Sequence, residues 1–140
     1  MRAYVNNPVF DFDSLAERND FLELLNRKCI DYEKFDDVVM ISKAGAFSIK
    51  VYFRFSFTMF KQIYNAVHNL AHYRVALDAA IARQFEAEQK FGRAVNDRLP
   101  NEKVAELYSE LLIAERHVRV NSVTRDNAIN AAADALFGEG

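Results

Sequence analysis

The clearest pattern in the chain is the alternation of apolar and polar residues from Ala46 to Ser56. Side chains of a β-strand point alternately to the two faces of a sheet, so this alternation predicts a strand. The residues on its apolar face are Phe47, Ile49, Val51, Phe53, Phe55 and Phe57. The pattern therefore predicts a small sheet that covers part of a hydrophobic core.

A helix is expected earlier in the chain. Ser14 is a good N-cap residue, and Glu17 three positions later completes the pattern of a capping box. The apolar residues that follow have helical spacing, and this spacing ends near Lys28 or Cys29. The segment is therefore predicted to be a helix of about four turns.

Short strands are expected on both sides of this helix. The first occupies either Arg2–Val5 or Val9–Phe12, because Pro8 between them cannot lie inside a central strand. A polar, acidic connection, Asp31–Asp37, leads to a strand at Val38–Ser42. A hairpin turn then leads into the alternating strand described above.

After that strand, the apolar residues recur in alternating steps of three and four. This spacing predicts a long helix, Thr58–Asn96, which ends before Pro100 because the residue before a proline disfavours helical geometry. A second long helix is predicted at Asn101–Phe137, and the short turn between them makes an antiparallel hairpin. The sequence leaves open whether the second helix is interrupted at Val118–Thr124, a stretch rich in β-branched residues.

Each long helix has a predicted inner side. Its members are Phe60, Ile63, Val67, Leu70, Leu77, Ile81, Phe91 and Val95 in the first helix, and Val104, Tyr108, Leu111, Val118, Ile129, Ala132 and Leu136 in the second. Other large apolar residues lie outside these registers: Tyr64, Tyr73, Val75, Phe85, Leu107, Leu112, Ile113 and Val120. A hairpin and a small sheet cannot cover all of them. We therefore expect the N-terminal helix and a second copy of the chain to do so, which predicts a homodimer.

These elements predict a single α+β domain over residues 1–140. An N-terminal β-α-β-β unit with a small antiparallel sheet (1–57) is followed by a long antiparallel helical hairpin (58–140). A chain of 140 residues is long enough to bury a core, and its four Gly and two Pro favour long regular elements.

The charge and the cysteine content narrow the function. A net charge of −2 predicts no overall attraction to nucleic acid. The only cysteine, Cys29, cannot form an internal disulfide, and the N-terminus lacks the apolar core of a signal peptide. No apolar run approaches the length of a membrane span. The sequence therefore predicts a cytoplasmic protein without a membrane segment, in its own cell or in a host.

His68 and His72 are the strongest candidates for metal ligands, because positions i and i+4 of a helix face the same way. Asn69 stands where the metalloprotease pattern needs a glutamate, and a third ligand from Cys29, His117 or an acid would be required. The favoured interpretation is a polar flank of the helix. No cofactor is expected.

Catalytic patterns are also missing. A cysteine near the C-terminus of a helix is poorly placed to form a thiolate. The pairs Asp11/Asp13 and Asp36/Asp37 lie at the ends of predicted elements, where carboxylates usually cap or face water. No phosphate loop and no nucleophile elbow is present. We therefore expect that the protein is not an enzyme.

Two groups of basic residues are candidates for partner binding. Lys50, Tyr52 and Arg54 alternate on the polar side of the Ala46–Ser56 strand, a row that suits either a protein partner or single-stranded nucleic acid. A solvated sheet face has the same composition. The second group is Arg74, Arg119 and Arg125 on the long helices. The hairpin turn brings Arg74 level with Arg125, so an internal acid or an acidic partner surface is expected beside them.

The sequence as a whole predicts a non-enzymatic protein that binds another protein and acts as a homodimer. An adaptor or inhibitor, including the accessory type that phages encode, fits such a chain. The alternatives are a nucleic-acid-binding protein that uses the strand face and a metal-binding protein that uses the two histidines.

Overall fold

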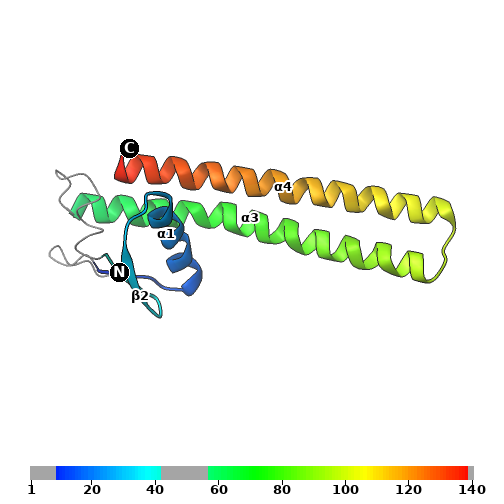
Figure 1. Cartoon of the computed structure of the whole chain (residues 1–140), viewed down its shortest axis with the longest axis horizontal. Coiled ribbons are helices and arrows are strands. Elements are labelled where there is room, and N and C mark those ends of the chain that lie inside the picture. The colour runs from blue at the N-terminus through cyan, green and yellow to red at the C-terminus, as the bar shows by residue number, and fades with distance from the viewer. Residues whose placement is uncertain (1–8, 42–56, 139–140) are drawn as a thin grey trace. The chain divides into compact units, whose positions relative to one another are not determined.

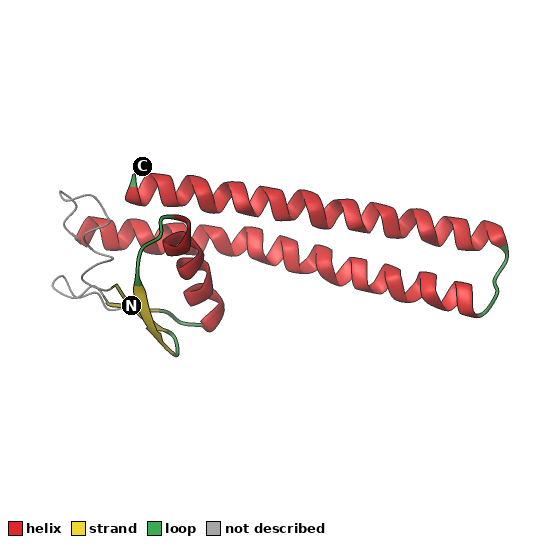
Figure 2. Ribbon diagram, in the orientation of Figure 1, coloured by secondary structure: helices red, strands yellow, loops and turns green. Residues whose placement is uncertain are grey.

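The computed structural model describes residues 9–41 and 57–138. Its elements follow one another as β1, α1, β2, β3, α3 and α4. Their bounds are Val9–Asp11 for β1, Leu15–Arg27 for α1, Tyr32–Phe35 for β2, Val38–Ile41 for β3, Phe57–Asn96 for α3 and Asn101–Phe137 for α4. A small antiparallel sheet followed by a helical hairpin confirms the predicted α+β class (Figure 1 and Figure 2).

The chain divides into two compact units. The first, which we call the sheet unit, consists of Met1–Ala71 and Asn127–Gly140. The second, which we call the hairpin unit, consists of His72–Asp126. The strand predicted at Ala46–Ser56 lies outside the described residues. Of the two places considered for the first strand, the described one, β1, matches Val9–Phe12.

Helix α1 begins and ends as predicted. The Ser14 side chain accepts a hydrogen bond from the Glu17 backbone N–H at 3.2 Å, which satisfies one of the free donors of the first turn. At the other end, the backbone N–H of Ile30 donates to the Leu25 carbonyl at 3.0 Å, and Cys29 takes the left-handed conformation with φ 54°. The exposed Cys29 therefore occupies the position that most often holds glycine in such a helix end.

The sheet corrects one prediction. Its strand order is β1-β3-β2, with β3 antiparallel to both neighbours. The segment Asp31–Asp37, predicted as a polar connection, contains β2 and a two-residue turn in which Asp36 has φ 49°. Strand β2 lies at an edge of the sheet, and only Tyr32 in it is partly buried. An edge strand needs few apolar residues, so its composition resembles that of a loop.

The core of the sheet unit is built around phenylalanine rings. Phe10 is fully buried, and its ring centroid lies 4.7 Å from that of Phe21 and 5.1 Å from that of Phe60. The C-terminal part of α4 joins the same core through Ile129 and Leu136. An ion pair between Lys28 and Asp134 connects the end of α1 to α4. Segments far apart in the sequence thus share one apolar cluster.

In the hairpin unit, α3 and α4 run in opposite directions on either side of a short turn (Figure 1). Helix α3 ends where Leu99 N–H donates to the Ala94 carbonyl at 3.1 Å, with Arg98 left-handed at φ 52°. Helix α4 is continuous through 118–124. Asn121 Nδ2 and Thr124 Oγ1 each donate, at 2.8 Å, to the backbone carbonyl four residues earlier, so neither side chain caps a new helix.

Candidate functional site

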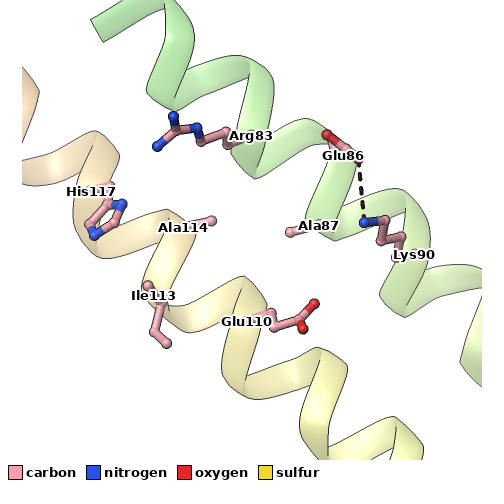
Figure 3. Close-up of a pocket in the computed structure, with 8 residues that line it drawn as sticks. All are labelled: Arg83, Glu86, Ala87, Lys90, Glu110, Ile113, Ala114 and His117. Atoms are coloured by element: carbon pink, nitrogen blue, oxygen red, sulfur yellow. Dashed lines mark ion pairs between the residues drawn. The ribbon is translucent and has the colours of Figure 1, made fainter. Parts of the chain in front are cut away.

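The two helices of the hairpin unit meet along a seam of small and medium-sized side chains. On each helix the buried and half-buried residues recur in steps of three and four. They are Leu77, Ala80, Gln84, Ala87, Phe91 and Ala94 on α3, and Val104, Leu107, Leu111, Ala114, Val118 and Asn121 on α4. Figure 3 shows Ala87 and Ala114 pointing toward each other across this seam.

The seam corrects the predicted register at several positions. Ile81, Val95 and Tyr108 were predicted to lie inside, but about half of each is exposed. Leu107, predicted to lie outside, is buried. At these places the residue just before the predicted one occupies the inner position. This residue is alanine at positions 80 and 94. A search for large apolar residues passes over such alanines and selects the neighbour.

One flank of the seam is charged. The residues that immediately precede seam residues include Arg83, Glu86, Lys90, Glu110 and His117. These five side chains line one shallow hollow of about 250 Å³, and Glu86 pairs with Lys90 at 3.3 Å (Figure 3). The residues directly before seam residues therefore lie on the same side of the hairpin in α3 and in α4. Both signs of charge are mixed there, as is usual for a solvated surface.

The opposite flank carries most of the large apolar side chains, beside the charged residues Asp78, Glu88, Glu115 and Arg119. The residues that immediately follow seam residues include Ile81, Phe85 and Val95 on α3, and Tyr108 and Leu112 on α4. Their exposed fractions lie between 45% for Leu112 and 62% for Phe85. In both helices, the residues directly before seam residues lie on one side of the hairpin. The residues directly after seam residues therefore lie on the other side. We call these five residues, together with Gly92, the apolar face.

Gly92 lies within this face and has no evident role inside the chain. Among the described residues, a Cβ atom added there would meet no atom within 4 Å beyond its chain neighbours and the backbone of its own helix, and the φ of Gly92 is not positive. Glycine inside a helix costs about 0.5–1 kcal/mol relative to alanine. Neighbouring Phe91 is half-buried, and its ring centroid lies 5.5 Å from that of Tyr108 on α4. Gly92 is thus a place without a side chain among large apolar side chains, and we call it the flat point of the face.

The predicted partner-binding residues have different outcomes. Lys50, Tyr52 and Arg54 lie outside the described residues. Arg74 and Arg125 are half-buried and Arg119 is exposed, all three within the hairpin unit. Arg74 and Arg125 each take part in an interaction within the chain. Arg119 directly follows the seam residue Val118, so it lies on the flank that carries the apolar face.

Among the described residues, the metal and nucleophile candidates do not form a metal-binding group. His68 and His72 are both exposed, and each has an interaction within the chain. Among residues 9–41 and 57–138, no group of three histidine, cysteine or acidic side chains is arranged to hold a metal ion. Cys29 is exposed at the end of α1. The described residues thus bring none of these side chains into a metal cluster.

The titration of Tyr64 is clearly perturbed. Its hydroxyl donates to the Asp11 carbonyl at 3.1 Å, and its ring lies beside Phe10 and Phe12. Burial raises the pKa of Tyr64 well above its usual range, and the nearby charges of Asp11 and Asp13 act in the same direction.

This shift predicts a loss of stability in alkali. The unfolded chain ionises Tyr64 near pH 10, whereas the folded chain keeps the proton. The contribution of Tyr64 to the free energy of unfolding is therefore complete below about pH 10 and is lost as the pH rises through the folded-state pKa. We expect the free energy of unfolding to fall above about pH 10 more steeply in the wild type than in Tyr64→Phe. Urea unfolding at several alkaline pH values measures both slopes, and equal slopes would contradict the prediction.

None of the helices among the described residues combines the length and the apolar character needed to cross a membrane. Comparison with known proteins found no matching family model, no matching curated protein and no matching solved structure.

Proposed function

We propose that the chain is a non-enzymatic protein–protein interaction module of the adaptor or inhibitor type, and that it acts as a homodimer. The observation that carries this proposal is the apolar face of the hairpin unit. Single exposed apolar residues are ordinary on a protein surface, but large side chains gathered on one side are typical of interaction sites. The opposite flank carries more charged side chains, and its exposed large apolar residues are Ile113 and Val120.

The hairpin itself gives a physical reason for a partner. Two antiparallel helices can bury only the stripe that each turns toward the other. Phe85, Tyr108 and Leu112 lie beyond that stripe, so they stay in water unless another surface covers them. Covering an apolar side chain of this size contributes about 1.5–3 kcal/mol if it was fully exposed, and correspondingly less for a half-exposed one.

Self-association is the testable form of this proposal. Light scattering during size-exclusion chromatography at micromolar concentration should give about twice the 16.1 kDa mass of the chain. Dilution should shift the protein toward the single-chain mass, because association follows mass action. A mass of one chain at every concentration up to the solubility limit would contradict the homodimer.

A further inference from the structure

We propose that the apolar face binds the same face of a second copy, so that the two hairpin units form an antiparallel four-helix bundle. In this arrangement α3 of one copy lies against α4 of the other, at the same level along the hairpin. This inference rests on the proposed function and names its interface. Three observations carry it: the size of the face, its flat point at Gly92, and the charges beside it.

The five large side chains of the face supply about half of the area that a stable dimer buries. The five large side chains are each about half exposed. If each presents on the order of 180 Å² when fully exposed, the five offer on the order of 450 Å² per copy. A stable interface buries about 800 Å² per partner. The aliphatic stems of Glu88, Glu115 and Arg119, which lie on the same flank, extend the area toward that value.

Gly92 explains how a second helix approaches. It interrupts a row of larger side chains and is needed neither for backbone conformation nor for packing inside the chain. A residue without a Cβ lets another surface reach the helix backbone. Tyr108 lies level with Gly92 in the hairpin, as its ring contact with Phe91 shows. With α3 against α4 at the same level, Tyr108 of the second copy covers Gly92 of the first.

One pair of opposite charges on the same flank, Asp78 and Arg119, supports this arrangement. Asp78 follows the seam residue Leu77 and Arg119 follows Val118, and both side chains are exposed. Within the described residues, neither forms an ion pair. The antiparallel hairpin places them within about one helical turn of the same level. Packing α3 against α4 of the second copy therefore brings Asp78 of each copy close to Arg119 of the other.

The competing arrangement places like charges together. If α3 packed crosswise on α3 of the second copy, with the apolar face centred on the twofold axis, the Glu88 side chains of the two copies would meet near that axis. Glu88 is exposed and accepts a hydrogen bond from Gln84 at 3.1 Å. Two carboxylates at the centre of an interface repel each other. The arrangement of α3 against α4 avoids this contact, because Glu88 there lies level with Leu112 of the second copy, and Glu115 of the second copy lies about one helical turn further along.

The test uses charge reversal in separate copies. Asp78→Arg and Arg119→Asp are made as two single variants of the full chain. A homodimer of either variant contains two like-charge contacts, so each should dissociate roughly 10 times more readily than the wild type. A mixture of the two variants restores both opposite-charge contacts, and only between copies. Heterodimers should therefore form with nearly wild-type affinity, as measured by native mass spectrometry and sedimentation equilibrium.

A second variant tests the flat point independently. Gly92→Leu replaces a weak helix former by a strong one, so the single chain should be at least as stable as the wild type. The added side chain occupies the place of Tyr108 from the second copy, so dimerisation should weaken by at least a factor of 10. The matched control is Arg83→Leu on the charged flank, which should leave the dimer unchanged.

The outcomes separate this inference from the proposed function. A wild-type chain that never dimerises overturns both. A wild-type dimer whose charge variants fail to rescue each other overturns the pairing of α3 with α4. A wild-type dimer that tolerates Gly92→Leu as well as Arg83→Leu overturns the interface, while the homodimer itself stands. Circular dichroism of each variant confirms that the chain is folded.

Discussion

Replacing Ile63 with aspartate is expected to unfold the sheet unit. Ile63 lies on α3 with no exposed surface, inside the cluster of phenylalanine, leucine and isoleucine side chains. An aspartate there either buries a charge among apolar groups or must take up a proton, and both are costly. We expect a loss of at least about 4 kcal/mol, comparable to the whole stability of a small domain. Thermal and urea unfolding followed by circular dichroism would measure it.

Ile113→Asp is the matched control for this prediction. Ile113 is 56% exposed and borders the hollow on the charged flank, so the same substitution leaves the new carboxylate in water. Its effect should stay within about 0.5 kcal/mol, as is usual for surface substitutions. Similar losses of unfolding free energy in both variants would show that burial of the new carboxylate does not determine the loss of stability.

The second large effect is expected from Phe10→Ala. Phe10 lies on β1 with its ring in contact with the rings of Phe12, Phe21, Phe60 and Tyr64. Removing this ring deletes the contacts and leaves a cavity that the surrounding helices can only partly fill. A loss of about 3–5 kcal/mol is expected from chemical denaturation.

Phe35→Ala supplies the comparison. Phe35 lies on the edge strand β2 and is 62% exposed, so its removal leaves no cavity. The substitution should cost less than about 1 kcal/mol. If Phe35→Ala were as destabilising as Phe10→Ala, the aromatic cluster would not be the main source of stability in the sheet unit.

The helices could be predicted from the sequence almost to the residue. The capping pattern at Ser14 and the approach to Pro100 are local signals, and both mark true helix boundaries in the structure. Strand β3 was also predicted, at Val38–Ser42, and the structure has it at Val38–Ile41. Strand β2 was missed because hydrogen bonding to β3, rather than an apolar face of its own, makes it a strand.

The candidate site was only partly predictable. Phe85 and Leu112 were identified as apolar residues outside the predicted inner side, and this led to the expected homodimer. Ile81 was assigned to the inner side of the first long helix. That assignment is wrong, because Ile81 is 49% exposed beside the buried Ala80. Hydrophobicity alone cannot show that alanine takes the inner position, since this depends on how closely the second helix approaches.

The composition of the sheet unit has a consequence for synthesis on the ribosome. Its core needs Ile129 and Leu136, which are translated after the whole of residues 72–126. At about 5–20 residues per second, the phenylalanine side chains of the first 71 residues wait several seconds for these partners. During that interval the contacts of the hairpin unit can already form, because they join residues close in sequence. The nascent chain is therefore most exposed to aggregation and to chaperones just before the C-terminal part of α4 emerges.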